Sequence, residues 1–152
     1  MKKYIVILMS ALCLMTIAGC ENESSEWGNA KDDVVGEWHL ITWNGEAVRD
    51  FDIYMKLGSN GRFEIYQQFS TPYYELYKGL YNAQGGVLSG KYSDDVLWND
   101  TYDYALSNGG QVLTLISRSD SHIQSVYARE RVPENLIVGE PSRAASAGRR
   151  AL

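Results

Sequence analysis

Apolar and polar residues alternate along the middle of the chain in short runs. In residues 51–57 every odd-numbered position is apolar: Phe51, Ile53, Met55 and Leu57. A strict period of two is typical of a β-strand with one face in the core. Seven further runs, rich in β-branched and aromatic residues, predict strands at 36–43, 62–69, 73–81, 87–92, 101–106, 111–116 and 123–131. No run combines a helical period with capping residues.

Short turn signals separate these runs, and they constrain how the strands pair. Asn60-Gly61, for example, tolerates the positive φ angles that a tight hairpin demands. Neighbouring strands joined by short turns pair antiparallel, because parallel pairing needs a crossover of a dozen or more residues. Eight strands in one meander leave two open edges unless the sheet closes on itself. We therefore expect an all-β domain, a single eight-stranded antiparallel up-and-down β-barrel, with a β-sandwich as the alternative.

The first twenty residues follow a different pattern. Two lysines precede an apolar stretch at residues 4–17, which is shorter than the roughly 20 residues of a membrane-spanning helix. The residues Ile17-Ala18-Gly19-Cys20 resemble the lipobox of bacterial lipoproteins. This resemblance implies a signal peptide at 1–19 that is cleaved, and a Cys20 that carries acyl chains such as palmitate. An ordinary secretory signal with an incidental Cys20 is the alternative.

Composition divides the rest of the chain into three parts. Residues 20–33 are acidic and polar and predict a flexible tether; 34–132 contain the strands; 133–152, rich in Ala, Ser, Gly and Arg, predict a disordered tail. Removing Lys2 and Lys3 with the signal peptide changes the net charge from -5 to -7. No basic run interleaved with aromatic residues remains, which excludes nucleic acid as a partner. Multiple acyl chains form a stable anchor, so we expect a lipid-anchored protein of the cell envelope. We place it on the outer membrane, facing either the periplasm or the cell surface.

A family resemblance rests on the start of the first predicted strand. Gly36-Glu37-Trp38 resembles the Gly-x-Trp signature of lipocalins, and the whole layout is similar to small lipocalin-like lipoproteins of Bacteroidota. The resemblance implies that Trp38 closes one end of the barrel and that an arginine late in the last strand, Arg129 or Arg131, packs across it. A strand that merely begins with a core tryptophan is the alternative. The long helix that follows the barrel in many lipocalins, and their disulfide, have no counterpart here.

Residues suited to catalysis or metal binding are few. The two histidines, His39 and His122, are far apart in sequence, and no Cys or His cluster has metal-ligand spacing. A serine nucleophile in a Gly-x-Ser-x-Gly elbow is absent from the sequence. We expect no enzymatic activity, no metal and no cofactor.

Two groups of carboxylates leave alternatives open. Asp94, Asp95 and Asp100 supply oxygen ligands for calcium in one interpretation and form a solvated hairpin tip in the other. Glu64 and Glu75, on neighbouring strands, form either an acid/base pair inside the barrel or ordinary surface charges. The surface interpretation is preferred for both groups.

Tyrosine is the distinctive residue of the predicted domain, which holds ten of the eleven in the chain. A flat apolar ring with a hydroxyl at its tip suits a cavity for a partly apolar ligand, although strand propensity alone also favours tyrosine. Alternation nominates four ligand-binding residues: Tyr77, Tyr81, Tyr102 and Tyr104. We expect a non-enzymatic module that binds a small, partly apolar molecule. The alternative is an accessory lipoprotein with a filled barrel that binds another envelope protein or a glycan.

Overall fold

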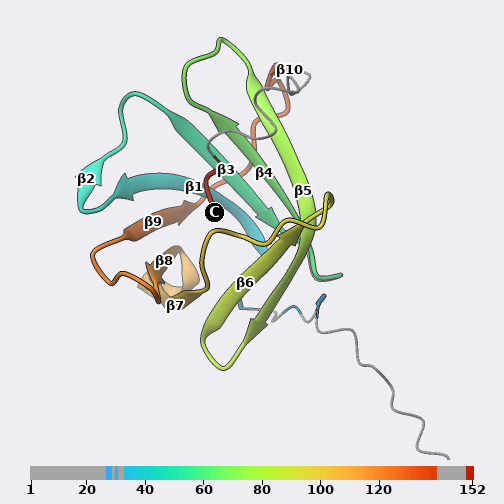
Figure 1. Cartoon of the computed structure of the whole chain (residues 1–152). Coiled ribbons are helices and arrows are strands. Elements are labelled where there is room, and N and C mark those ends of the chain that lie inside the picture. Colours follow the sequence, from blue (N-terminus) through green and yellow to red (C-terminus); the bar gives the residue numbers. More distant parts are fainter. Residues whose placement is uncertain (1–26, 29, 31–32, 140–149) are drawn as a thin grey trace, which may run out of the picture.

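The computed structural model describes residues 27–28, 30, 33–139 and 150–152. The predicted signal peptide and the lipidation residue Cys20 lie outside the described residues. Eight strands form the main body (Figure 1): β1 (Gly36–Trp43), β3 (Asp52–Leu57), β4 (Arg62–Gln68), β5 (Tyr74–Gln84), β6 (Val87–Tyr92), β7 (Tyr102–Ser107), β8 (Val112–Ser117) and β9 (Gln124–Arg129). Two short strands, β2 (Glu46–Ala47) and β10 (Val138–Gly139), and a 3-10 turn, η1 (Asn108–Gly110), complete the structure.

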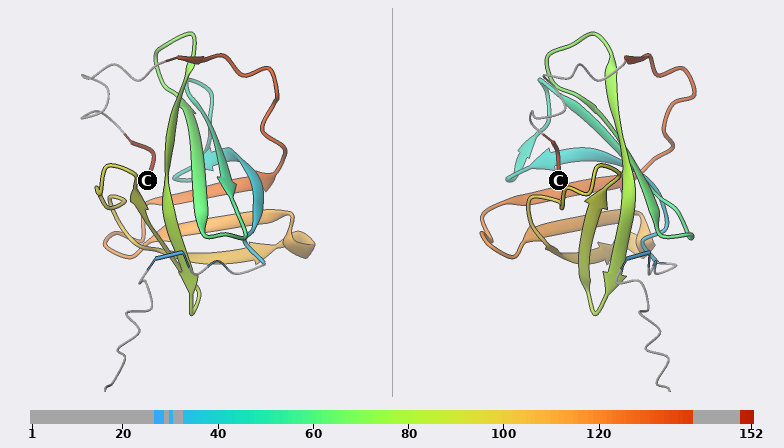
Figure 2. Two further views of the ribbon diagram at one scale, coloured as in Figure 1. Left: turned by 90° about the vertical axis from the view of Figure 1, so that its right-hand side faces the viewer. Right: turned by 45° about the vertical axis from the view of Figure 1, so that its right-hand side comes forward.

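The eight strands close into a barrel. Each pairs antiparallel with the next along the chain, and β9 returns to pair with β1, where Trp38 lies opposite Arg129. The views in Figure 2 show the strands wrapping around a common interior. The prediction of an all-β, eight-stranded antiparallel barrel is confirmed, and the sandwich alternative is wrong. Closure gives every one of the eight strands a partner on both sides.

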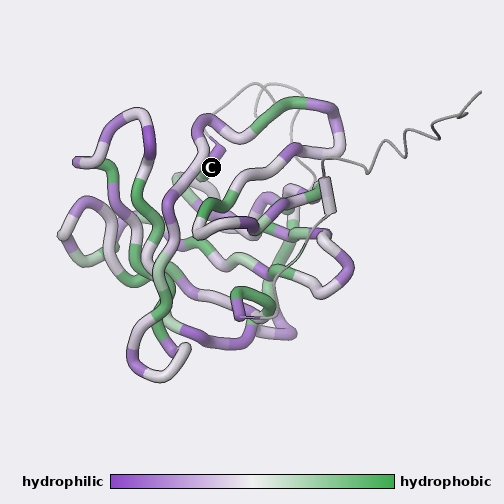
Figure 3. The backbone as a smooth tube through the Cα atoms, turned by 90° about the horizontal axis from the view of Figure 1, so that it is seen from below, coloured by the Kyte–Doolittle hydropathy of each residue, from purple (hydrophilic) through white to green (hydrophobic). Residues whose placement is uncertain are grey.

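Alternation along each strand separates the core from the surface. In β4, Phe63, Ile65 and Gln67 are buried, whereas Glu64 and Tyr66 face outward. Figure 3 shows the same alternation of hydrophobic and hydrophilic positions along the backbone. The largest fully buried side chains are Trp38, Tyr81, Tyr127, Phe63, Leu40, Ile53, Met55, Leu57, Ile65, Leu88, Leu113 and Leu115. Bulky side chains therefore fill most of the interior.

One end of the barrel is closed by Trp38. Its indole nitrogen donates a hydrogen bond to the carbonyl of Val34 at 2.9 Å, and the guanidinium carbon of Arg129 lies 4.1 Å from the centre of the ring. Arg129 also donates to the carbonyl of Gly110 at 2.8 Å. Gly36 has a φ of 151°, and a Cβ there would lie 2.2 Å from the Arg129 guanidinium. Gly36, Trp38 and Arg129 thus meet at one end of the barrel, as the lipocalin resemblance implied. Arg129, rather than Arg131, lies over the tryptophan ring.

Of the neighbouring strands in the barrel, β6 and β7 share the fewest residue pairs. These strands share only two residue pairs, Val87 with Asp103 and Leu88 with Tyr102. Trp98, from the long loop that connects them, is 5% exposed and packs so closely on Gly90 that a Cβ there would lie 2.1 Å from the indole. The Trp98 side chain therefore covers the part of the wall where backbone pairing is missing.

The flanking segments differ from their predictions. In the predicted flexible tether, Gly28 donates a backbone hydrogen bond to the Tyr81 carbonyl at 3.0 Å, and Ala30 packs against the core. In the predicted disordered tail, β10 pairs parallel with the start of β5. The residues Arg150–Leu152 are also ordered, with Ala151 6% and Leu152 1% exposed. The prediction of disorder is wrong for these described residues, because contacts with distant strands hold segments that are too short to show any periodicity.

Candidate functional site

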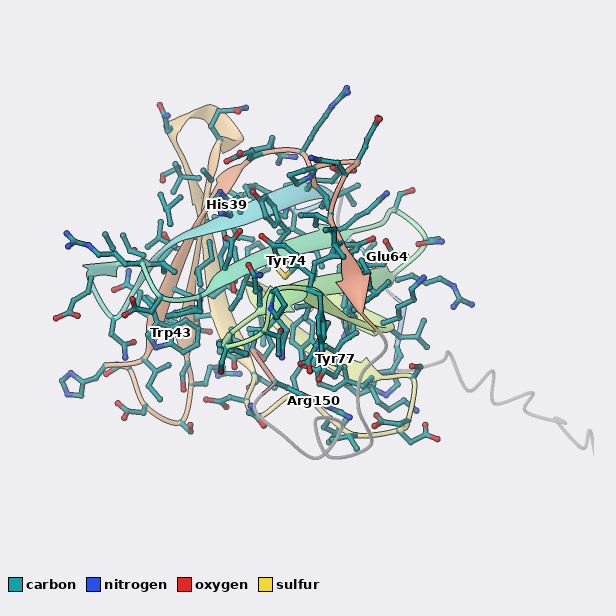
Figure 4. The ribbon with its side chains drawn as sticks, turned by 90° about the horizontal axis from the view of Figure 1, so that it is seen from above. His39, Trp43, Glu64, Tyr74, Tyr77 and Arg150 are labelled. Atoms are coloured by element: carbon teal, nitrogen blue, oxygen red, sulfur yellow. The ribbon has the colours of Figure 1, made fainter. Side chains whose placement is uncertain are left out.

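The end of the barrel opposite Trp38 holds a small aromatic pocket. Its volume is about 260 Å³, and its lining residues are Trp43, Phe51, Ile53, Phe69, Arg150 and Ala151. The ring of Phe51 contacts those of Trp43 and Phe69, with centres 6.3 and 5.5 Å apart. Figure 4 labels Trp43 and Arg150, which both lie in the lower half of the view. A concave site of this kind, mostly apolar with few polar groups, is typical of small-molecule binding.

A β-bulge in β1 turns Trp43 toward this pocket. The pairing of β1 with β9 slips between Leu40 and Thr42, so that Leu40 lies opposite Tyr127 and Trp43 lies opposite Ser125. Both partners on β9 are buried, so Leu40 and Trp43 share the inner face although three positions separate them. A bulge adds one residue to a strand and re-aims the side chains that follow. Strict alternation from Trp38 would have turned Trp43 outward.

Two residues of the segment Arg150–Leu152, Arg150 and Ala151, form the other wall of the pocket. The N–H of Ala151 donates to Oε1 of Gln67 at 3.0 Å, and the hydroxyl of Tyr92 donates to the main-chain oxygen of Leu152 at 2.8 Å. The guanidinium of Arg150 donates to Asp94 at 3.2 Å through Nη1. Burial raises the pKa of Tyr92, which keeps its hydroxyl protonated as a donor. A piece of the chain itself therefore lies where the barrel opens.

The four tyrosines predicted to bind ligand do not form one site. Tyr77, Tyr81 and Tyr102 are buried, and Tyr104 is half-buried against the core. The Tyr81 hydroxyl donates to the Gly58 carbonyl at 2.8 Å, and the Tyr102 ring lies against Trp98. Only Tyr77 reaches the occupied opening.

Tyr77 combines a carboxylate partner with a cation. Its hydroxyl donates to Glu75 at 3.1 Å, and the guanidinium carbon of Arg150 lies 5.4 Å from its ring centre. Burial, followed by the charge of Glu75, raises the pKa of Tyr77 to about 12. Tyr77 is therefore the one nominated tyrosine that lies against the segment at the open end, although it does not line the aromatic pocket, and its role in binding stays a prediction.

Sequence reasoning missed Gln67 and Tyr92. Gln67 is 1% exposed and occupies an inward position of β4 that alternation reserves for an apolar side chain. A polar residue at such a position is a signal, because buried polar groups need hydrogen-bond partners. The partner, Ala151, lies 84 residues further along the chain and gives no sequence signal of its own.

The two histidines lie on the outside. His39 bridges two carboxylates, with Nε2 2.7 Å from Asp52 and Nδ1 2.9 Å from Glu130, and its ring stacks on Tyr54 at 4.2 Å. Tyr74 donates a hydrogen bond to the same Asp52. His122 is exposed. The His39 cluster ties β1, β3, β5 and the residue after β9 together on the outer face.

The carboxylates Glu64 and Glu75 do not form a pair. Glu64 faces outward, 3.1 Å from the Lys78 ammonium, and accepts a hydrogen bond from Tyr66. Burial raises its pKa, but the hydrogen bonds from Lys78 and Tyr66 outweigh this and leave the pKa below its usual value. Glu75 lies on the inner side, where it accepts a hydrogen bond from Gln67 at 3.4 Å. The acid/base interpretation is therefore wrong, because the barrel wall separates the two groups.

The three aspartates around Trp98 have separate partners. Asp94 binds Arg150, Asp95 lies 2.8 Å from the Lys91 ammonium, and Asp100 binds the turn after β8. Across the part of the chain that the structure describes, no three His, Cys, Asp or Glu side chains gather as metal ligands. The calcium interpretation therefore has no support in these residues.

Asp100 is expected to contribute to acid sensitivity. It accepts hydrogen bonds from Ser117, the Ser119 hydroxyl at 2.7 Å and the Ser119 N–H at 3.0 Å, and these hold its pKa far below the usual value. A lowered folded-state pKa stabilises the protein above the unfolded pKa of about 3.9, and this contribution is lost as pH falls further. Asp100→Ala is expected to lower the free energy of unfolding by roughly 1–2 kcal/mol at pH 7. The deficit should shrink below about pH 4.

Denaturant titrations at pH 7 and pH 3 measure this difference. Asp103→Ala is the matched control, because Asp103 only forms an exposed ion pair with Arg118 at 3.5 Å. Its effect should stay within about 0.5 kcal/mol at both pH values. A deficit for Asp100→Ala that is equal at both pH values would contradict the role of its ionised form.

The closed barrel of eight antiparallel strands is consistent with a lipocalin-like fold. Comparisons of the chain with models of known protein families and with curated protein sequences give no match. Among the described residues, no helix has both the length and the apolar character needed to cross a membrane.

Proposed function

We propose that this chain is a lipid-anchored, non-enzymatic protein of the cell envelope whose lipocalin-like barrel binds a small, partly apolar molecule at its open end. The aromatic pocket of Trp43, Phe51 and Phe69 carries this proposal. Its volume of about 260 Å³ lies near the lower limit for ligand pockets, roughly 300 Å³, and favours a small ligand. Gln67 and Tyr92 lie nearby, but they are bound to Ala151 and Leu152, so they offer hydrogen bonds to the polar part of a molecule that displaces this segment.

Native mass spectrometry of the full chain tests the binding. The chain is held in lipid nanodiscs, incubated with extract of its own cell envelope, and released in the spectrometer. We expect a retained adduct of small mass that is lost in Trp43→Ala and Phe51→Ala, because each substitution removes an aromatic wall of the pocket. Leu97→Ala, at an exposed loop position away from the pocket, is the control and should retain the adduct.

The anchoring part of the proposal rests on the lipobox-like residues before Cys20. Cys20→Ala is expected to move the protein from the membrane fraction to the soluble fraction, because the acyl chains provide the binding energy, about 0.8 kcal/mol for each buried methylene. Fractionation followed by immunoblotting measures the shift. Cys13→Ala, a change within the predicted signal peptide, is the control and should leave the protein with the membrane.

The filled interior favours a second candidate, an accessory protein that binds an envelope protein or a glycan through its outer surface. Bulky buried side chains leave little space between the closed end and the pocket. Ile137 and Val138, which are 72% and 44% exposed, offer an apolar contact on the outside. In the mass measurement, a bare protein under conditions where the chain is folded would favour this candidate.

A further inference from the structure

The open end of the barrel already holds a piece of peptide. Ala151 and Leu152 are almost fully buried, and both belong to the core cluster formed by the strands. Figure 1 marks the end of this segment near the middle of the view, and both views in Figure 2 show it beside the loop that follows β6. The contacts around the segment therefore show which chemical groups this end of the barrel accommodates.

Two buried side chains bind the backbone of the segment. Oε1 of Gln67 accepts the Ala151 N–H, and the Tyr92 hydroxyl donates to the main-chain oxygen of Leu152. The other end of the Gln67 amide, Nε2, donates to Glu75, which directs Oε1 toward the segment. Gln67 and Tyr92 are 1% and 3% exposed, so their polar atoms depend on partners inside the protein. Together they bind one amide N–H and one main-chain oxygen of the segment.

A third position binds a cation. The Arg150 guanidinium contacts the Asp94 carboxylate, and its central carbon lies 4.3 Å from the ring centre of Tyr92. A carboxylate and an aromatic face both favour a positive charge. Beyond the two backbone contacts, the Leu152 side chain is enclosed by the core. The three positions thus accommodate a basic, a small and a branched aliphatic residue, in that order.

We propose that the open end of the barrel is a peptide-binding site, filled in cis by Arg150–Leu152, which accepts in trans a short peptide with the order basic, small, branched aliphatic. This inference rests on the proposed function and deepens it, because it names the ligand class. The polar part of the ligand is a peptide amide, and the apolar part is an aliphatic side chain. The segment and the added peptide compete, since both bind Gln67 and Tyr92.

Isothermal titration of the full chain in lipid nanodiscs tests the competition. The probe is the peptide acetyl-Arg-Ala-Leu-amide, and empty nanodiscs correct for its partition into lipid. Ala151→Pro removes the N–H that Gln67 accepts and thereby releases the segment. We expect this variant to bind the probe about tenfold more tightly than the intact chain, in which the segment blocks the site. Ala151→Gly retains the N–H and should bind like the intact chain.

Two further measurements separate specific binding from other effects. The reversed peptide, acetyl-Leu-Ala-Arg-amide, has the same composition and should bind at least about tenfold more weakly than the probe. In the Ala151→Pro chain, Gln67→Leu removes the acceptor and should weaken binding of the probe by about tenfold. Equal binding of the two peptides, or no gain from Ala151→Pro in a folded chain, would overturn the proposal.

Circular dichroism establishes whether each variant is folded. If Ala151→Pro does not fold, deletion of residues 150–152 replaces it with the same expectations. If neither folds, the segment is a structural part of the core and the proposal is overturned. A chain that retains the envelope adduct in mass spectrometry but does not bind the probe overturns the peptide assignment alone. Loss of both overturns the proposed function as well.

Discussion

Trp38→Ala is expected to lower the free energy of unfolding by roughly 3–5 kcal/mol, the usual cost of truncating a fully buried aromatic side chain. Trp38 is 0% exposed and closes one end of the barrel. The substitution removes its hydrogen bond to Val34 and leaves the Arg129 guanidinium without the ring on which it lies. It also leaves a cavity that the closed sheet has little freedom to fill.

Denaturant titration, followed by circular dichroism, measures this loss. Ile41→Ala provides the control on the same strand, because Ile41 is 40% exposed, and its effect should remain below about 1 kcal/mol. Trp38→Phe should fall between the two, since it restores a ring but not the indole N–H. Similar losses for Trp38→Ala and Ile41→Ala would show that the closed end contributes little to stability.

The second large loss of stability is expected between β6 and β7, where Trp98 covers the barrel wall. Trp98→Ala should also cost roughly 3–5 kcal/mol, because the indole packs on Phe63, with ring centres 5.1 Å apart, and lies against Gly90. β6 and β7 share only two residue pairs, so little backbone pairing remains to hold this region when the ring is gone. The substitution therefore opens the barrel as well as destabilising it.

Substitution of the neighbouring residue, Leu97, is the control for Trp98→Ala. It lies in the same loop but is 58% exposed, and Leu97→Ala should change the free energy of unfolding by less than about 0.5 kcal/mol. Binding of an apolar fluorescent dye such as ANS reports the opening, and only Trp98→Ala should increase it. Equal dye binding by the two variants would mean that Trp98 does not seal the wall.

Local patterning predicted the strands because it is a property of neighbouring residues. The period of two places Phe63 and Ile65 inside, and eight short strands with turns between them leave closure as the way to pair both edges. The predicted fifth strand, 87–92, matches β6 at both ends. The predicted fourth strand ended at residue 81, whereas β5 continues to Gln84, and its turn falls at Gly85-Gly86, where both φ angles are positive.

The open end was not predictable in the same way, because three non-local effects create it. The bulge near Ile41 reverses the face on which Trp43 lies, and the sequence carries no marker for it. The buried Gln67 side chain accepts a hydrogen bond from Ala151, and only folding brings these two residues together. Alternation placed the four nominated tyrosines on the inner side, but it does not tell one end of the barrel from the other. The sequence therefore predicted inward-facing residues without showing which of them gather at the opening.

The pairing of β1 with β9 has a consequence for the time at which the fold forms. Trp38 lies opposite Arg129, so the contact that closes the barrel joins residues 91 positions apart. Contacts between such distant positions slow folding, because the loop between them must be ordered first. A chain emerging from a ribosome or a translocation channel cannot complete β1 until residues 124–129 have followed it. Until then one edge of β1 remains without its strand partner. During this interval the protein is most susceptible to aggregation and to proteolysis.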